Sequence, residues 1–568
     1  MSGPAATPTP ADPASDRARY FARFLDALRD RPGERCLVLE RGGAREALSF
    51  REMGARIAAR AATLHAAGLG PGQVLLIFSD TRVDLHVTFF AAQFLGAVPA
   101  IMPPPNAKQD EAHWRDSHRA LVRHIGPGLL CGVGPALDAL GDTGVPAISF
   151  AALGAREVVA DGAVPEVAAG DDGPALLQHS SGTTGLKKGV MLGYGALVRQ
   201  ADSYGAALAL RPDDVVATWL PLYHDMGLIA CTVLPFIAAM PVVGVDPFEW
   251  LTDPLLILRL AERERATLAW LPNFAFEHLA NAARRLRNTR LDLGTLRAVV
   301  NCSEVCRPAS MDRFAAAYAA HGLDSAAPAT CYALAENVFA ATQSRPGVPP
   351  KRLVLDRAAL DAGRLVAVEA GAPASVALVS SGAPVDGCRI RFRPAEGYAG
   401  EVGEILLSSP CLFDGYLGSP TLTAERLEDG WLRTRDLGFL HEGEVFVLGR
   451  LDDIVIYRGR NLVAPDLEAA LSDVAAVKPG RAVVFPIPDE RVGSDQIVVL
   501  YEPSEPLDAA AAAEAERAVR ALLGERFAVN PVHVGCVEPG SLRKTTSGKV
   551  SRVLNRAAFL ADQDGTTP

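Results

Sequence analysis

The chain has 568 residues, of which 49% are hydrophobic and 21% charged, a balance typical of globular proteins with more than one core. Its 56 basic and 66 acidic residues give a net charge of −10, which argues against a polybasic binder of nucleic acids or membrane surfaces. Nine cysteines without a Cys-x-x-Cys pair argue against a disulfide scaffold or a zinc cluster, so we expect a reducing, cytoplasmic location.

The first half of the chain alternates helical and strand patterns. Residues 1–16 have no apolar core and predict a disordered lead-in rather than a secretory signal. Apolar residues recur at helical spacing over 19–30 and 49–69. Short apolar runs predict buried strands, at 73–79, 97–103, 128–134, 215–222, 266–272 and 296–303. This alternation predicts parallel sheets covered by helices.

Residues 226–245 carry no charge and are long enough to cross a membrane. Pro235 and Pro241 interrupt the segment, and Asp225 and Asp246 bound it closely. A buried core segment is therefore the favoured interpretation, and we expect no membrane span.

The pattern changes after about residue 380. Strands separated by Gly-rich turns predict a mostly β subdomain, at 376–382, 388–394, 403–409, 431–440 and 444–450. Beyond Arg450 the pattern is again mixed, with a helix from about Pro465 and an Ala-rich helix around 508–527. We expect a large α/β domain over 17–451 and a small α+β domain over 452–562.

A Gly- and hydroxyl-rich loop follows the predicted strand 174–179. It contains Ser180, Ser181, Gly182, Thr183, Thr184 and Gly185 and is followed by Lys187 and Lys188. Glycines let backbone N–H groups turn inward, and hydroxyls and ammonium groups suit phosphate oxygens. The spacing is not that of a Walker A loop. A flexible Ser/Gly linker is the alternative.

This loop resembles the phosphate loop of the adenylate-forming superfamily of acyl-CoA synthetases, peptide-synthetase adenylation domains and luciferases, and Lys188 aligns with its lysine. Tyr332–Glu336 resembles the next motif. The resemblance implies that Tyr332 lies near adenine and that Glu336 helps to hold Mg²⁺, for which a carboxylate is suited.

Three later motifs appear in the order of that family. Thr434–Asp436 resembles Thr-Gly-Asp, which implies that Asp436 accepts both ribose hydroxyls. Gly449–Asp453 implies that Arg450 contacts the nucleotide and that Asp452 is the hinge of a mobile C-terminal lid. The motif Arg543–Arg552 implies that Lys549 catalyses adenylation. Singly, Glu336, Asp436 and Lys549 could be solvated residues; five motifs in order favour the family.

Two features are most similar to the fatty acyl-AMP ligase branch. The first is a set of motifs that includes Tyr223–Leu228, Leu271–Phe276 and Asn301–Glu304. These imply substrate contacts by His224, Asn273 and Phe274 and nucleotide contacts by Ser303 and Glu304. A core or capping role is the alternative for His224.

The second feature is an insertion at about 346–376, with the pattern Asp-x-x-Ala-Leu-x-x-Gly-Arg from Asp356 to Arg364. In that branch it keeps the C-terminal domain from the orientation that makes acyl-CoA. The alternative is a surface hairpin without this effect.

The resemblance implies ATP- and Mg²⁺-dependent activation of a hydrophobic carboxylic acid, such as a fatty acid, to an acyl-adenylate and pyrophosphate. The acyl group would then pass to a separate acyl carrier protein, in polyketide or lipopeptide assembly. The alternatives are an acyl-CoA synthetase and a relative that binds ligand without turnover. Four residues depart from the family pattern and suggest an unusual substrate or altered nucleotide contacts: Tyr194, Ala333, Asn337 and Arg435.

Overall fold

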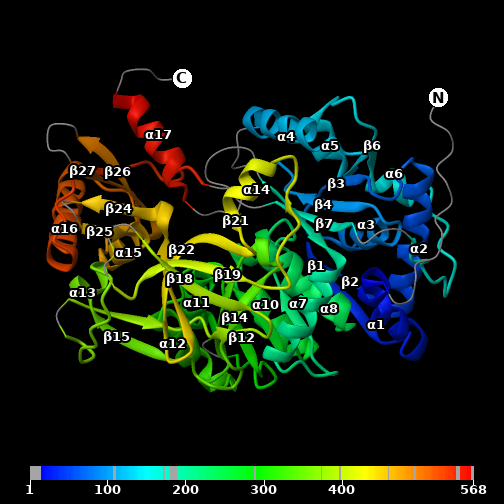
Figure 1. Ribbon diagram of the computed structural model, residues 1–568, viewed down its shortest axis with the longest axis horizontal. Helices are drawn as coiled ribbons and strands as arrows, with labels where there is room; N and C mark the ends of the chain where they lie inside the picture. Colours follow the sequence, from blue (N-terminus) through cyan, green and yellow to red (C-terminus); the bar gives the residue numbers. More distant parts are fainter. Residues whose placement is uncertain are drawn as a thin grey trace.

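The computed structural model describes most of the chain, and every structural statement below concerns these residues. They are 15–105, 111–169, 173–179, 188–286, 289–372, 374–395, 398, 400–457, 460–489, 494–544 and 550–563. Figure 1 shows the early part of the chain in blue and cyan at one end of the molecule, and the last part in orange and red at the other.

The largest sheet has nine strands in the order β17-β14-β13-β12-β11-β9-β10-β1-β2. Its central strands are parallel, and β2, β14 and β17 pair antiparallel at the two ends. The strands are β1 (Arg35–Arg41), β2 (Ala44–Ser49), β9 (Val216–Thr218), β10 (Val242–Val245), β11 (Leu268–Leu271), β12 (Ala298–Asn301), β13 (Pro328–Ala333), β14 (Ala340–Gln343) and β17 (Ala383–Pro384).

A second sheet has seven strands in the order β20-β8-β7-β4-β3-β5-β6. Strands β3 to β7 run parallel, whereas β8 pairs antiparallel with both β7 and β20. The strands are β3 (Val74–Phe78), β4 (Val98–Met102), β5 (Leu129–Gly132), β6 (Ala147–Ser149), β7 (Pro174–His179), β8 (Gly189–Gly193) and β20 (Gly415–Tyr416). The alternation of strand and helix patterns predicted these parallel sheets.

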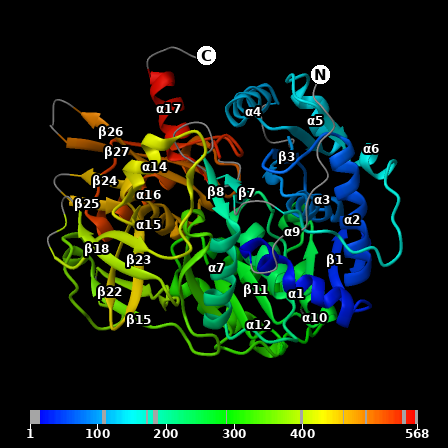
Figure 2. The same cartoon turned by 45° about the vertical axis from the view of Figure 1, so that its right-hand side comes forward.

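Helices cover both sheets (Figure 2). Helix α3 (Val83–Phe94) is buried at eleven of its twelve positions, as expected of a helix that is apolar on all sides. Helix α2 (Phe50–Ala66) begins with a capping box between Ser49 and Glu52. The other helices of this part are α1 (Asp16–Asp30), α4 (Glu111–Ile125), α5 (Gly134–Leu140), α6 (Phe150–Gly154), α7 (Tyr194–Ala207), α8 (Leu234–Ala238), α9 (Pro247–Thr252), α10 (Leu255–Glu264), α11 (Asn273–Ala282) and α12 (Pro308–Tyr318).

The uncharged segment 226–245 is buried, as predicted. It forms a π-helix, η1 (Met226–Val233), then α8 and β10. A Cβ on Gly227 would overlap the carbonyl oxygen of Pro221, and the Thr232 hydroxyl donates to the Gly227 carbonyl at 3.0 Å. Among the helices of the described residues, none combines the length and hydropathy needed to cross a bilayer.

The predicted β subdomain is a five-stranded antiparallel sheet in which β22 is the longest strand. Its strands are β18 (Arg389–Pro394), β19 (Gly403–Ser408), β21 (Leu427–Glu428), β22 (Trp431–His441) and β23 (Glu444–Arg450). Helix α14 (Pro420–Arg426) joins β20 to β21. The insertion forms a separate two-stranded sheet of β15 (Arg352–Asp356) and β16 (Ser375–Val379), with α13 (Arg357–Asp361) between them.

The last part of the chain has a hydrophobic core of its own, built from buried residues between Val455 and Val534. The short turn η5 (Leu451–Asp453) leads into it from β23. Its elements are β24 (Ile454–Tyr457), β25 (Arg460–Val463), α15 (Ala464–Ala470), β26 (Val477–Asp489), β27 (Ser494–Pro503), α16 (Ala509–Phe527), β28 (His533–Cys536) and α17 (Arg552–Gln563). The Ala-rich helix predicted around 508–527 is α16.

Candidate nucleotide and acyl site

The candidate phosphate loop joins two neighbouring strands. Strands β7 and β8 pair antiparallel, with His179 opposite Gly189. The loop between them, with Ser180, Ser181, Gly182, Thr183, Thr184 and Gly185, lies outside the described residues. Lys188 is described and directly precedes β8. This pairing therefore places both ends of the loop at the carboxyl end of β7.

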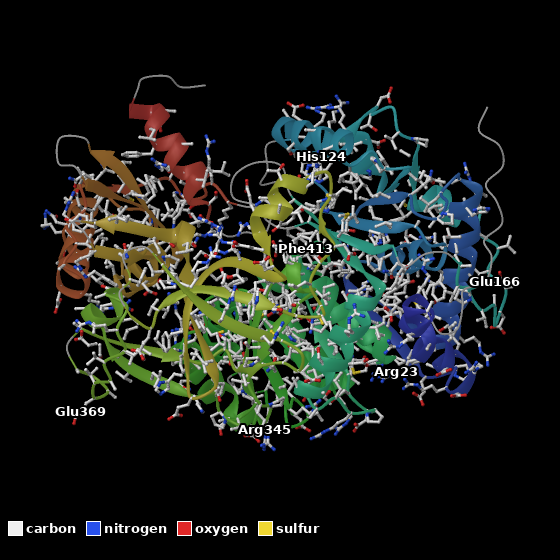
Figure 3. The ribbon with its side chains drawn as sticks, in the orientation of Figure 1. Arg23, His124, Glu166, Arg345, Glu369 and Phe413 are labelled. Carbon is white, nitrogen blue, oxygen red and sulfur yellow. The ribbon has the colours of Figure 1, made fainter. Side chains whose placement is uncertain are left out.

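Lys188 and Glu336 meet at Tyr416. The Lys188 ammonium lies 5.6 Å from the centre of the Tyr416 ring, and the Tyr416 hydroxyl donates to Glu336 Oε1 at 2.7 Å. The Phe413 N–H donates to the Glu336 carbonyl at 2.9 Å, and Figure 3 shows Phe413 near the middle of the molecule. Strand β20 thus connects the phosphate-loop strand to the turn η4 (Ala335–Asn337) that carries Glu336.

The ammonium of Lys188 sits in a mixed electrostatic environment. Burial lowers its pKa, and Arg426 and Arg450 add to this effect, whereas Glu336 and Asp452 oppose it. Tyr416 links Lys188 to Glu336 by direct contacts, and Arg450 and Asp452 act electrostatically on the same ammonium. Cationic groups beside a carboxylate suit a phosphate ligand that is bound together with a divalent cation.

Glu336 fits a magnesium site in which the nucleotide supplies most of the ligands. No three His, Cys, Asp or Glu side chains converge as a metal cage in the part of the chain that the structure describes. Mg²⁺ is commonly held by one or two carboxylates together with phosphate oxygens and water, so a single carboxylate beside Lys188 suits it.

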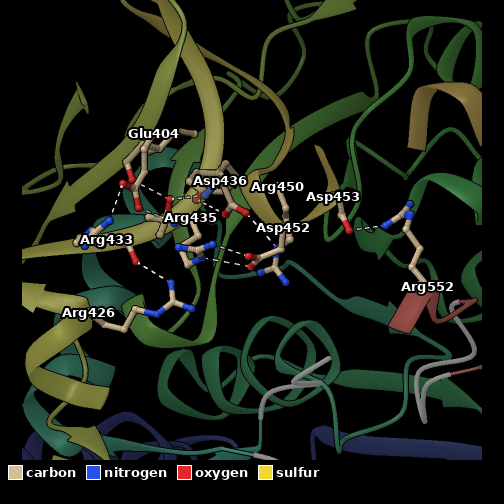
Figure 4. A network of polar contacts seen from close by, with 12 residues as sticks. Glu404, Arg426, Arg433, Arg435, Asp436, Arg450, Asp452, Asp453 and Arg552 are labelled. Carbon is tan, nitrogen blue, oxygen red and sulfur yellow. Dashed lines mark hydrogen bonds and ion pairs between the residues drawn. The ribbon is translucent and has the colours of Figure 1, made fainter. Parts of the chain in front are cut away.

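A second polar group, formed by Tyr332, Asp436 and Arg450, brings β13, β22 and β23 together. The Tyr332 hydroxyl donates to Asp436 Oδ2 at 2.6 Å. Arg450 Nε donates to Asp436 Oδ1 at 3.1 Å, and Figure 4 shows these two residues side by side. Asp436 and Arg450 are opposite each other on adjacent strands. Burial raises the pKa of Asp436, and the Arg450 guanidinium counteracts this and favours the carboxylate.

Arg435 extends away from this group toward Asp452. It donates two hydrogen bonds to the Asp452 carboxylate, one of them 3.2 Å long, and holds the pKa of that carboxyl below its usual range. Its backbone has φ 62°, a left-handed conformation that suits the glycine usual at this position. The Arg435 N–H donates to buried Glu404 at 3.2 Å. The departure at Arg435 thus adds an ion pair to the predicted hinge.

The next hinge residue is held from the other side. Arg552, at the start of α17, pairs with Asp453 and donates to both oxygens of Glu468, at 3.0 and 2.7 Å. Figure 4 shows Asp452 facing Arg435 and Asp453 facing Arg552. Adjacent aspartates therefore bind one group from the β subdomain and one from the last helix.

Lys549 lies outside the described residues, but both ends of its loop are described. Lys544 and Val550 form a β-bridge, and the Ser551 N–H donates to the Arg543 carbonyl at 2.9 Å. Arg552 therefore ties the C-terminal end of this loop to the hinge.

The predicted acyl-side residues have different surroundings. The Asn273 amide is buried and used internally: it donates to Ser310 Oγ at 3.2 Å and accepts from Asn301 Nδ2 and the Arg307 N–H, both at 3.0 Å. Phe274 is 43% exposed beside Trp219 and Trp250.

Three further predicted residues surround the start of η1. Glu304 accepts from the Phe274 N–H at 3.1 Å. The Ser303 hydroxyl lies 3.7 Å from the sulfur of Met226, and the His224 ring contacts Tyr223. These residues lie where η1, α11 and the end of β12 meet. The Asn273 side chain stabilises that junction through its bonds to Ser310, Asn301 and Arg307.

Two of the departing residues are core residues. Tyr194 is buried under the Arg17 guanidinium and donates to the Gln93 carbonyl at 3.2 Å. Asn337 is buried and donates to the Ala340 carbonyl at 2.9 Å. Neither contact involves the candidate nucleotide groups, so these two substitutions are explained by packing.

Tyr416 is a candidate functional residue that the sequence motifs did not identify. Tyr416 directly follows Gly415, whose φ of 118° favours glycine. This Gly-Tyr pair is the sequence signal that could have identified Tyr416. We expect Tyr416→Phe to raise the Mg²⁺ concentration for half-maximal adenylation by about threefold to tenfold, because Glu336 loses a hydrogen bond that orients it. Tyr318→Phe, which removes a hydroxyl bonded to the Leu279 carbonyl, is the control. An unchanged Mg²⁺ dependence would exclude this role for Tyr416.

Comparison with known proteins identifies the family. Residues 24–417 match the model of the AMP-binding enzyme family. The chain belongs to this family. It is an ATP-dependent, adenylate-forming ligase of the fatty acid ligase type.

Named relatives differ in the acceptor of the acyl group. The chain is 30% identical, over 98% of its length and 99% of the relative, to a protein of Caulobacter vibrioides named "Putative acyl-CoA synthetase". It is 29% identical, over 68% of both chains, to the medium-chain-fatty-acid–[acyl-carrier-protein] ligase JamA of Moorena producens. A structure from a study of fatty acyl-adenylate ligases of E. coli and L. pneumophila superposes with a TM-score of 0.84 at 25% identity, covering 96% of this chain and 98% of that one. The fold is therefore that of adenylate-forming enzymes.

Proposed function

We propose that the protein is a fatty acyl-AMP ligase that activates a hydrophobic carboxylic acid with ATP and passes the acyl group to the phosphopantetheine thiol of an acyl carrier protein. The observation that carries the first step is the meeting of Lys188, Glu336, Asp436 and Arg450 in one charged site. In this proposal Lys188 and the phosphate loop hold the phosphates, Tyr332 faces the adenine, and Asp436 accepts the ribose hydroxyls. Ser303 and Glu304 complete the nucleotide contacts.

Both reactants are anionic, so the enzyme must lower their repulsion. The acid's carboxylate oxygen attacks the α-phosphorus, the bond to the bridging oxygen breaks, and pyrophosphate leaves. Lys188 and Lys549 stabilise the charge that spreads over the phosphate oxygens and keep the groups in line. Mg²⁺, held by Glu336 and phosphate oxygens, would add further neutralisation. His224 and Phe274 would border the acid.

The acceptor is proposed from the insertion, which contacts the C-terminal part directly. Asp361 accepts from Arg460 at 3.0 Å, and Arg357 donates to Asp466 at 2.7 Å while lying 5.6 Å from the Phe527 ring. Figure 1 shows α13 beside the C-terminal elements. These contacts would oppose rotation about Asp452 into a thioester-forming arrangement with CoA. The name of JamA supports a carrier acceptor, whereas the name of the Caulobacter relative favours the second candidate, an acyl-CoA synthetase.

The insertion contacts give a testable prediction. We expect Arg357→Ala to increase acyl-CoA formation at least about fivefold, because it removes the Asp466 contact and frees the C-terminal part. Arg352→Ala is the matched control, since Arg352 lies in the same hairpin but pairs with Asp312, at 2.7 and 2.6 Å, in α12. The measurement is acyl-CoA yield from acid, ATP and CoA. Equal yields from both variants would exclude the proposed restraint.

A ligand-binding relative without turnover is the least favoured alternative. Lys188, Glu336, Asp436 and Lys549 are all present, and the first three lie in a charged site. Release of pyrophosphate that depends on an added acid would show turnover and exclude the hypothesis of a relative that only binds ligand.

A further inference from the structure

One face of the β subdomain carries a row of arginines. Strand β18 places Arg389, Arg391 and Arg393 on the same face, because alternate residues of a strand point to the same side of the sheet. The residues between them, Ile390 and Phe392, pack against the main hydrophobic core. The three arginines therefore stand on the face that is turned away from that core.

Strand β22 extends this basic face across the sheet. In the register of the sheet, Leu406 of β19 is opposite both Arg391 of β18 and Arg433 of β22, so Arg433 is on the same face. Trp431, two residues earlier on β22, is on this face as well. The Arg391 guanidinium lies 4.1 Å from the centre of the Trp431 ring, and that of Arg389 lies 5.5 Å from it. We call these five outward residues the arginine face: Arg389, Arg391, Arg393, Trp431 and Arg433.

The positive charge of the arginine face is only half balanced. Arg393 pairs with Glu428 at 3.0 Å, and Arg433 pairs with Glu404 at 3.4 Å. The other two arginines are exposed, and neither forms an ion pair within the described residues. The whole chain has a net charge of −10, so two exposed cations without a carboxylate run against its overall charge. Such a local surplus favours a partner with an acidic surface.

The residue types of this face are those that carry binding energy in protein interfaces. Arginine and tryptophan are enriched at interfaces and among their strongest contacts. A guanidinium that lies over an aromatic ring keeps its N–H donors free at its edge, where they suit the two oxygens of a carboxylate. Arg389 and Arg391 are both placed in this way over Trp431. The face is therefore preorganised for carboxylates on a folded partner.

The arginine face continues into the candidate site. Strand β22 runs from Trp431 through Arg433 to Arg435 and Asp436, and these five steps span at most about 17 Å of extended strand. Arg435 binds the predicted hinge residue Asp452, and Figure 4 shows Arg435 between Arg433 and Asp452. A partner bound at Trp431 would thus lie beside the hinge and close to the proposed ribose-binding carboxylate.

We propose that the arginine face is the docking surface for the acyl carrier protein. Carboxylates of the carrier would pair with Arg389 and Arg391, and an apolar side chain between them would pack on Trp431. The body of the carrier must stay outside while its phosphopantetheine thiol reaches the acyl-adenylate, and a surface on the strand that carries Asp436 meets this need. This inference rests on the proposed function, since it assigns the protein contact of the second step.

The test compares two double charge reversals. R389E/R391E should raise the KM for a phosphopantetheinylated carrier that the wild-type protein loads by about tenfold or more, because like charges would then face each other. Its acyl-adenylate formation, measured as pyrophosphate release without carrier, should stay at the wild-type rate. The matched control is R23E/R345E, which makes the same change in net charge at two exposed arginines that Figure 3 labels in other parts of the molecule.

Two further measurements separate the possible outcomes. Trp431→Ala should raise the same KM without a change in charge, and added salt should slow loading by the wild type more than loading by R389E/R391E. An equal KM for both double variants would overturn the docking surface and leave the proposed function in place. Unchanged loading with lost binding to phosphatidylserine vesicles would assign the face to a membrane and also overturn it. If the wild type forms adenylate but loads no carrier, the proposed acceptor fails and the inference falls with it.

Discussion

Replacing Lys549 with alanine is expected to lower the rate of acyl-adenylate formation by about two to three orders of magnitude, the usual cost of removing one preorganised charge or donor from a transition state. Its loop is anchored by the Lys544–Val550 bridge, and Arg552 links that anchor to Asp453 and Glu468. In the proposed function this loop would bring the Lys549 ammonium to the site, and alanine removes the charge without removing the described anchors.

The control for this variant is Lys478→Ala, an exposed lysine on β26 in the same part of the chain. Lys478→Ala should adenylate the acid at the wild-type rate. Its melting temperature should equal that of Lys549→Ala, which would show that the loss of rate in Lys549→Ala is not a loss of stability. Transfer from preformed acyl-adenylate to an acceptor should be much less affected by Lys549→Ala than the first step is. A wild-type rate of adenylation by Lys549→Ala would show that another group stabilises the transition state.

Replacing Asp436 with alanine is expected to lower kcat/KM for ATP by about a hundredfold. The substitution removes the acceptor proposed for the ribose and leaves the buried Tyr332 hydroxyl and the Arg450 guanidinium without their shared partner. Tyr332 and Asp436 are buried, whereas 59% of the Arg450 side chain is exposed, so water offsets the loss at Arg450 and most of the cost falls on Tyr332 and on ligand binding.

The matched control for Asp436→Ala is Asp312→Ala, which breaks the exposed pair with Arg352. Exposed pairs contribute little, so this control should change neither stability nor the KM for ATP. Asp436→Asn keeps the shape and one acceptor and should fall between wild type and Asp436→Ala. An unchanged KM for ATP in Asp436→Ala, measured on folded protein, would contradict the ribose role.

The sequence predicted the regular elements well, because periodicity is a local property. The parallel strands, the β subdomain and α16 lie where apolar spacing placed them. The segment 226–245 was predicted as core, but its π-helix was not, since it follows from contacts between Gly227 and Pro221 and from the Thr232 hydroxyl. Helical periodicity carries no signal for those contacts.

Site residues were predicted by resemblance to motifs, and their contacts were not. The bond between Tyr332 and Asp436 joins residues 104 positions apart, and Tyr416 reaches Glu336 across 80 positions. Arg435 was expected to reflect an unusual substrate or altered nucleotide contacts, and its side chain pairs with Asp452. Asn273 matched a substrate motif, yet its amide braces Asn301, Ser310 and Arg307. These outcomes depend on which strands become neighbours, and a single sequence does not show that.

The central claim is tested most directly by mass spectrometry of one incubation of the protein with Mg-ATP and free acids from short to long. The incubation is run alone, with CoA, and with a phosphopantetheinylated carrier protein. We predict acyl-adenylate that accumulates without an acceptor, is unaffected by CoA and loads the carrier. Acyl-CoA as the main product would contradict the assignment as a fatty acyl-AMP ligase, and the absence of any adenylate would contradict the proposed activity altogether.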